Sequence, residues 1–259
     1  MAKTFMILFY RLSSFVATFI GALGFFALFL GWSHPYVAVS LSTFFIAVVL
    51  ARLLGWHLRT FQFWHLLGTP TLFFLSSFGP FFLLEHFLTK VVLTVLVVFF
   101  LFLFVEHVFS FTHLPMNYQP FTLEYLSQLL HILSVFFLST LGFGLSLFLH
   151  TPLWFLSVIF FFILFFIVYG TLWAGKIDPQ RARPYAFAGA LLTTELFASL
   201  SFLPTGFYSN AAFLALGVYV FLGLSRAHAL HKLSREILKR YLILFFFLSV
   251  LIVLTSQWV

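Results

Sequence analysis

The feature that most constrains the fold is a series of nine apolar segments, each long enough to cross a lipid bilayer as a helix. A transmembrane helix needs about 17–25 predominantly apolar residues, because it must span a hydrocarbon core about 30 Å thick. Only helices and closed barrels satisfy every backbone hydrogen bond in lipid, and these segments lack the sustained alternation of barrel strands. The sequence predicts an all-α, polytopic integral membrane protein with about nine transmembrane helices, near residues 12–31, 36–54, 64–84, 88–109, 123–148, 153–173, 185–203, 209–225 and 241–257.

The composition excludes a water-soluble globule. Of 259 residues, 63% are hydrophobic and 7% are charged, and the mean hydropathy is +1.14. A soluble domain carries about a quarter charged residues. There is no cysteine, so disulfides and thiolate metal sites are excluded. Connections between the segments are short, and we expect one transmembrane domain over residues 1–259.

The basic residues predict an orientation in the membrane. If nine helices alternate in direction, one side of the membrane collects twelve of the thirteen Lys and Arg residues, and the other side has only Lys90. Loops rich in Lys and Arg stay in the cytoplasm. This places the N-terminus in the cytoplasm and the C-terminus outside, in the plasma or inner membrane of the cell. Because the cations gather on one side of the membrane, the net charge of +7 is explained by membrane topology and does not indicate nucleic-acid binding.

Glu195 is an acid near the middle of an expected span. It lies ten residues into the segment 185–203, which corresponds to a depth of about 15 Å at 1.5 Å per residue. Its helical neighbours Ala188, Ala198 and Ser199 are small, and such a face is expected to point into the helix bundle. An ionisable group inside a membrane is a candidate functional residue by default.

A partner for Glu195 is expected on the fifth segment. Glu124, Gln128 and His131 share one helix face, and His131 lies about 12 Å deep by the same helical rise. We expect a cytoplasm-facing polar cavity around Glu195 and His131; the alternative is a hydrogen bond between them that only fixes helix packing. The complete expected site consists of Glu195, His131, Gln128, Glu124, Glu106 and His107, with the last three at its mouth.

The third segment contains a candidate hinge. Pro70 removes a backbone donor and frees a carbonyl near Leu66, and Gly68 lies two residues before it. This pattern predicts a kink or a short unwound stretch. Neighbouring groups often re-satisfy the backbone at such prolines, so the kink can also be purely structural.

Two basic segments are expected at the cytoplasmic surface. Residues 226–240 predict an amphipathic helix on the membrane, where each basic residue contributes about 1 kcal/mol of attraction to anionic headgroups. Residues 174–184 predict a turn at Asp178-Pro179. The expected partner is the lipid bilayer, with anionic headgroups bound by Arg181, Arg183, Arg226, Lys232, Arg235, Lys239 and Arg240.

The sequence predicts no metal and no cofactor. The outer His and Glu residues lack the i, i+3 or i, i+4 spacing of helical metal sites, and no His-Glu-x-x-His motif occurs. Nothing in the sequence identifies a protein partner.

Three functions are compatible with these features. The first is a small transporter, permease or lipid-handling protein, which requires a water-filled cavity reaching Glu195. The second is an enzyme that acts on a lipid, which requires His131 and Glu195 within hydrogen-bond reach. The third is a non-catalytic subunit of a complex, which requires neither but leaves a face of small residues uncovered. The balance of these features leans away from an enzyme.

Overall fold

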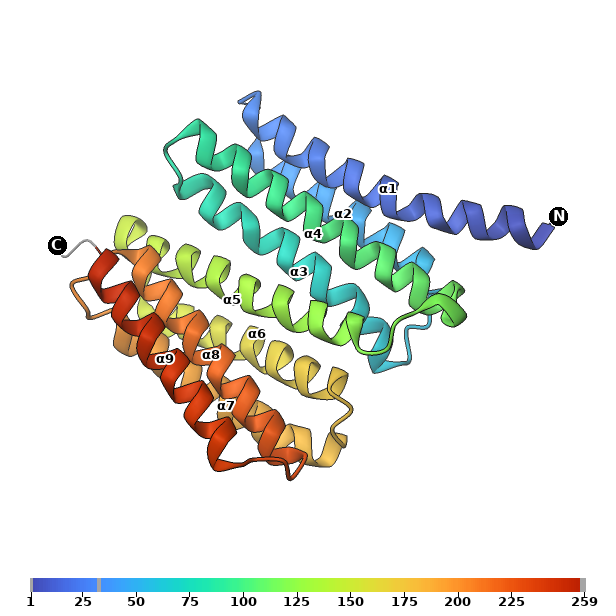
Figure 1. Cartoon of the computed structure of the whole chain (residues 1–259). Coiled ribbons are helices and arrows are strands. Elements are labelled where there is room, and N and C mark those ends of the chain that lie inside the picture. The colour runs from blue at the N-terminus through green and yellow to red at the C-terminus, as the bar shows by residue number, and fades with distance from the viewer. Residues whose placement is uncertain (1, 32–33, 257–259) are drawn as a thin grey trace. The chain divides into compact units, whose positions relative to one another are not determined.

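The fold is all-helical. A computed structural model of the protein describes residues 2–31 and 34–256, and within these ranges it contains nine α-helices, one short 3-10 helix and no strand (Figure 1). Each α-helix overlaps one of the nine predicted segments. The elements are α1 (Ala2–Phe29), α2 (Pro35–Leu53), α3 (Phe61–Leu83), α4 (Phe87–His113), η1 (Pro115–Asn117), α5 (Thr122–Leu149), α6 (Leu153–Ala174), α7 (Pro179–Leu200), α8 (Phe207–Ala229) and α9 (Arg235–Thr255).

The helices confirm a polytopic helical membrane protein. Within the described ranges, eight of them are long and apolar enough to cross a membrane. The exception is α7, which has 22 residues but includes Arg181, Arg183 and Glu195. Its length suits a span, and its composition is the least apolar in the chain.

Side-chain caps set where several helices begin. Asp178 accepts a hydrogen bond from the Gln180 backbone amide at 3.2 Å, and Pro179 occupies the first helical position, where its missing N–H costs nothing. The pair that predicted a turn therefore starts α7, six residues before the expected boundary. Ser234 caps α9 in the same way by accepting a hydrogen bond from the Ile237 amide at 3.3 Å.

The prediction of one amphipathic surface helix over residues 226–240 is wrong. Residues up to Ala229 continue α8, and residues from Arg235 onward begin α9. His231 lies between them with a φ of 55°, a left-handed conformation that interrupts a helix.

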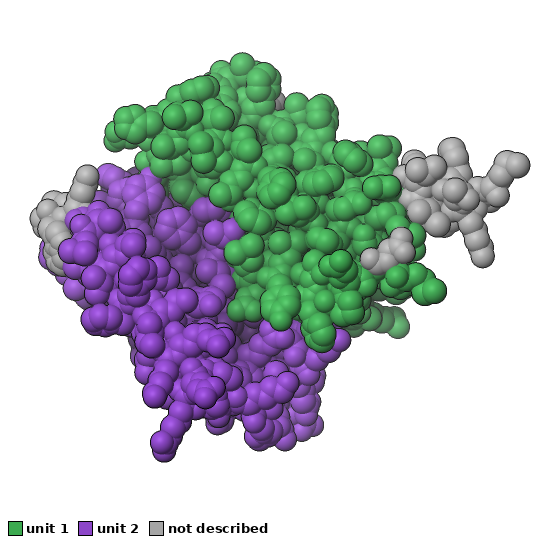
Figure 2. Space-filling model, in the orientation of Figure 1, with its two compact units in different colours: residues 1–130 green, residues 131–259 purple. Residues whose placement is uncertain are grey.

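The chain divides into two compact units, residues 1–130 and 131–259, which Figure 2 distinguishes by colour. The boundary falls inside α5. The single transmembrane domain expected from the sequence stays a prediction.

In the first unit, α1 packs on α2 and α4, and α3 packs on the same two helices. Gly21 of α1 lies where all four meet: a Cβ added there would be 3.0 Å from Leu101, 3.3 Å from Phe74 and 3.8 Å from Ile46. Without a hydrophobic force between helices in lipid, such small residues allow the close contact that holds the bundle together.

In the second unit, α7 lies between α6 and α8, and α9 packs on α8. The ring of Phe197 on α7 stacks on Phe160 of α6 at 4.4 Å and on Phe143 of α5 at 4.6 Å between centroids. Gly189 of α7 lies directly against the Phe221 ring of α8. These contacts fix the register of α5, α6, α7 and α8.

Candidate functional site

Glu195 lies on the exposed face of α7, so the prediction that it points into the helix bundle is wrong. The buried face of this helix consists of Ala182, Ala186, Gly189, Ala190, Thr193, Phe197 and Leu200. The helix carries small residues on two sides, and the side with Gly189 is the one that meets α8. The Ser199 hydroxyl donates to the backbone carbonyl of Glu195 at 2.8 Å, which does not involve the carboxylate.

His131 is buried in the second unit, with 0% of its surface exposed. Its Nδ1 lies 2.7 Å from the Thr171 hydroxyl of α6, and that hydroxyl lies 2.8 Å from the Ile167 carbonyl. A hydroxyl has one proton, so when it is donated to the carbonyl, Nδ1 of His131 is the donor of the other bond. The pair forms a polar contact between α5 and α6.

His131 and Glu195 do not lie at the same depth, so the prediction that they share a cavity is wrong. Phe197 stacks on Phe143, so Glu195 is level with about residue 141 of α5, roughly 15 Å along the helix from His131. The predicted depth is too small because α7 begins at Pro179, six residues before the predicted span. Glu195 is therefore about 24 Å along its helix, not about 15 Å.

Glu124 lies in the first turn of α5 and interacts with the preceding loop. The Tyr118 hydroxyl donates to Oε2 of Glu124 at 3.2 Å and accepts from the Leu123 amide at 3.0 Å. Burial raises the pKa of Tyr118, the Leu123 N–H opposes this rise, and the negative charge of Glu124 adds to it. Tyr118 is therefore protonated at neutral pH and can donate this bond. Gln128, one turn further along α5, is half-buried.

Glu106 connects α4 to α1. Its Oε2 accepts from the Ser14 hydroxyl at 2.8 Å, and its Oε1 lies 3.5 Å from Nε of Arg11. The contact serves helix packing within the first unit. His107, the next residue, is half-buried.

The proline in α3 does not interrupt the helix, which runs from Phe61 to Leu83. The Thr69 hydroxyl donates to the His65 carbonyl at 2.8 Å and the Thr71 hydroxyl donates to the Leu67 carbonyl at 2.7 Å, so hydroxyl donors are present on both sides of Pro70. Such donors re-satisfy a backbone that a proline disturbs. A hinge at Gly68 and Pro70 stays a prediction.

The predicted lipid-contact residues lie at one end of the second unit. The α6–α7 and α8–α9 connections lie close together at this end (Figure 1). The Arg181 guanidinium donates from Nη1 to Nε2 of His231 at 3.0 Å, and Tyr185 hydrogen-bonds to His228. The seven residues occupy the start of α7 (Arg181, Arg183), the end of α8 (Arg226), the α8–α9 connection (Lys232) and the start of α9 (Arg235, Lys239, Arg240).

The sequence gives little signal for four residues that make the contacts described above, namely Thr171, Tyr185, His228 and His231. Thr171 gave no signal, because threonine is common in spans. His228 and His231 form a His-x-x-His pattern that is weak by itself, and Tyr185 lies at the start of a predicted span. Their roles depend on contacts between helices.

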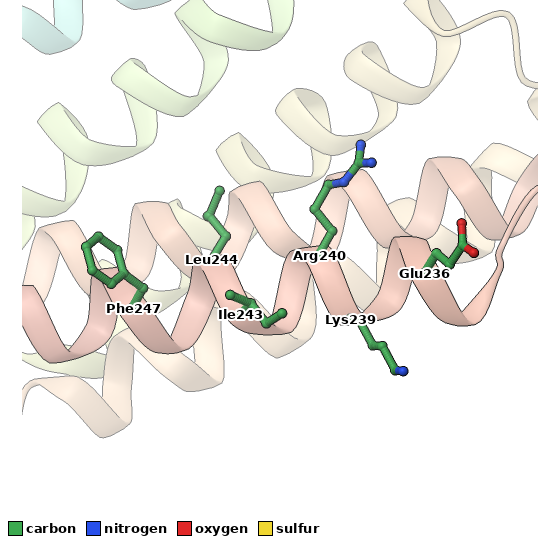
Figure 3. Close-up of a pocket in the computed structure, with 6 residues that line it drawn as sticks. All are labelled: Glu236, Lys239, Arg240, Ile243, Leu244 and Phe247. Atoms are coloured by element: carbon green, nitrogen blue, oxygen red, sulfur yellow. The ribbon is translucent and has the colours of Figure 1, made fainter.

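Two open grooves involve α9. One has a volume of about 590 Å³ and runs along α9 from Glu236 to Phe247; Arg240 and Leu244 project from one side of the helix and Lys239 from the other (Figure 3). The second, of about 420 Å³, has apolar walls from α5, α8 and α9 with Tyr219 among them. Neither groove includes Glu195 or His131.

Among the residues that the structure describes, no three His, Asp or Glu side chains gather as a metal site would require. No protein-family model, curated protein or solved structure matches the chain. The geometry alone therefore supports the functional proposal.

Proposed function

We propose that the protein is a membrane-embedded subunit of a larger complex, and that a transmembrane helix of a partner protein binds along the outer face of α7. The observation that carries this proposal is the exposed carboxylate of Glu195.

Glu195 lies at a depth where a bare carboxylate is unfavourable. Phe197, two residues further along α7, stacks on Phe160 in the interior of α6, which is a candidate span. On insertion scales an acidic side chain costs about 2.5–3.5 kcal/mol at the centre of a membrane helix, and the cost falls toward the helix end, which for α7 lies five residues beyond Glu195 at Leu200. A partner that pairs with the carboxylate would offset this cost.

The composition of α7 supports the same conclusion. In a membrane protein, the least apolar helix is the one expected to be surrounded by protein, and α7 is the least apolar here. Its inner face is covered by α6 and α8. Its outer face exposes Ala188, Leu192, Glu195 and Ser199 at helical spacing, and the small residues on either side of the acid allow a second helix to approach closely.

The partner helix is expected to carry a basic side chain opposite Glu195. Among the described residues, the basic side chain that a second copy would offer near this depth is Lys90, four residues into α4, and its ammonium already lies over the Phe81 ring of its own chain at 5.3 Å from the centroid. Charge complementarity therefore favours a different protein. From the positive-inside rule, we place the complex in the cell membrane with the α6–α7 and α8–α9 connections in the cytoplasm.

The other two functions considered, an enzyme and a transporter, have less support. An enzyme using His131 and Glu195 as an acid–base pair needs them within hydrogen-bond reach, and they lie about 15 Å apart along the helix direction. A transporter needs a water-filled cavity that encloses Glu195, and Glu195 lies on the exposed face of α7.

Photo-crosslinking in native membranes tests the proposal. A photoreactive amino acid replaces Leu192 on the outer face of α7, and Val158 on the exposed face of α6 serves as a matched position. We expect one adduct of defined mass from position 192 and none of that mass from 158. Adding Glu195→Gln abolishes the adduct, whereas Glu85→Gln, which changes an exposed loop glutamate, leaves it intact.

Mass spectrometry of the adduct completes the test. The crosslinked peptide should come from a transmembrane helix of another protein and contain Lys, Arg or His near the crosslink. An adduct with the mass of two copies, or equal yields with and without Glu195→Gln, contradicts the proposal. Unchanged membrane levels and thermal unfolding of the Glu195→Gln variant show that a lost adduct reflects lost binding.

A further inference from the structure

We propose that the end of the second unit formed by the α6–α7 and α8–α9 connections binds the phosphate group of an anionic ligand, with Arg181 and His231 as its central side chains. This proposal is independent of the partner helix on α7.

The charge at this end is strongly one-sided. The segments that form it carry eight of the thirteen Lys and Arg residues of the chain, and only two acids, Asp178 and Glu236. Asp178 is engaged as the cap of α7. The eight cations are Lys176, Arg181, Arg183, Arg226, Lys232, Arg235, Lys239 and Arg240.

The central contact joins two basic side chains. Nη1 of Arg181 lies 3.0 Å from Nε2 of His231, and among the described residues no carboxylate lies within ion-pair distance of Arg181. A guanidinium only donates, so Nε2 of His231 is the acceptor in this contact. A guanidinium has five donors in a planar fork, which matches the oxygens of a phosphate.

The backbone around this pair is well defined. Asp178 caps α7 and so fixes the turn that carries Arg181. Tyr185, one turn further along α7, hydrogen-bonds to His228 at the end of α8. The Arg226 side chain packs against Gly175, where an added Cβ would lie 3.3 Å from Nε. These contacts hold the two connections next to each other.

Membrane topology alone does not require this arrangement. The positive-inside rule requires cations near the cytoplasmic ends of spans, but it does not require the cations to contact other side chains. The contact joins two residues fifty positions apart in the sequence and uses one of the five guanidinium donors. The other donors of Arg181 can bind an anion at the same place.

The ligand is identified by its chemistry as a phosphate that carries net negative charge. At the end of a spanning bundle, the phosphate can come from the headgroup of an anionic phospholipid or from a soluble phosphate. A zwitterionic headgroup is expected to bind more weakly, because its ammonium group is repelled by the surrounding cations.

Native mass spectrometry of the detergent-purified protein tests the site. The probes are phosphatidic acid, phosphatidylcholine with the same acyl chains, and inorganic phosphate. We expect phosphatidic acid to bind preferentially, and Arg181→Gln to weaken its binding by about tenfold, as the loss of a charge-assisted hydrogen bond predicts. The matched control is Arg183→Gln, which removes the same charge two residues away, where the side chain faces a different direction on the helix.

His231→Asn provides a second variant. His231 has a φ of 55°, which asparagine tolerates better than most residues, so this change alters the imidazole with little backbone strain. It should also weaken binding of phosphatidic acid. Circular dichroism and gel filtration check that each variant is folded.

The outcomes separate the sources and the alternatives. If inorganic phosphate displaces phosphatidic acid in an Arg181-dependent way, the site takes a free phosphate; if it does not, the site takes the headgroup of a lipid. Equal losses for Arg181→Gln and Arg183→Gln would mean diffuse attraction without a site, and they overturn the proposal. Equal binding of phosphatidic acid and phosphatidylcholine overturns it as well.

Discussion

Two histidines, His65 and His131, are buried inside helices that are candidate spans, with 1% and 0% of their surfaces exposed. A polar side chain at such a position needs a hydrogen-bonding partner. For His131 one partner is the Thr171 hydroxyl at 2.7 Å, which links α5 to α6. In membranes such bonds between helices average about 0.6 kcal/mol and reach about 1.7, because the unfolded chain in lipid also finds partners.

Thr171→Val should therefore destabilise the protein by about 1 kcal/mol, since it keeps the shape of the side chain and removes the hydroxyl. Thermal unfolding in detergent measures this change. Thr171→Ser, which keeps the hydroxyl, is the control and should retain most of the stability. A valine variant as stable as the serine variant would show that the bond contributes nothing.

At the scale of helices, the contacts of α8 depend on glycine. The Tyr241 ring of α9 lies directly against Gly223, and the Phe221 ring lies against Gly189 of α7. Among the described residues α9 has none that is buried, and it packs mainly on α8. A side chain at Gly223 therefore acts on the main contact of α9.

Gly223→Ala should displace Tyr241 and destabilise the α8–α9 pair by about 1–3 kcal/mol, as overpacking does. Limited proteolysis of the connection between α8 and α9, together with thermal unfolding, measures the effect. Gly206→Ala is the matched control, because nothing lies within 4 Å of its added Cβ. The double variant Gly223→Ala, Tyr241→Ala should lose less stability than the two single changes added together; strict additivity would mean that the two residues do not interact.

At the scale of the whole molecule, the topology depends on α7. If α7 crosses the membrane, the connection after it lies outside and the α8–α9 connection lies inside. If it does not cross, both connections that flank α7 lie on the same side. The chain has no cysteine, so single-cysteine variants report one position each without background.

We expect Phe202→Cys to react with a membrane-impermeant thiol reagent in intact cells, because residue 202 is 80% exposed and follows α7. Lys232→Cys, in the α8–α9 connection, should react only after the membrane is permeabilised. Labelling of both variants in intact cells, or of neither, would contradict a nine-span topology. The unsubstituted chain gives the blank.

Much of the helical architecture could be predicted from the sequence, whereas the proposed site could not. Each expected segment overlaps a helix, because the backbone in lipid has few alternatives to a helix. The errors occurred where polar residues start or interrupt helices. The Asp178-Pro179 pair, which predicts a turn, begins α7, and this places Glu195 further along its helix than the sequence predicts. His231 interrupts what looked like one amphipathic helix.

The sequence by itself determined that the protein is helical and membrane-embedded, because runs of apolar residues have only one stable backbone form in lipid. Tertiary structure decided which face of each helix is buried. On α7, small residues occur on two faces, and the packing of Gly189 on Phe221 and of Phe197 on Phe160 buries one face and leaves Glu195 exposed. The periodicity of the sequence places a residue on one face of its helix, but the neighbouring helices decide whether that face contacts protein. Those contacts depend on packing between segments that are distant in the sequence.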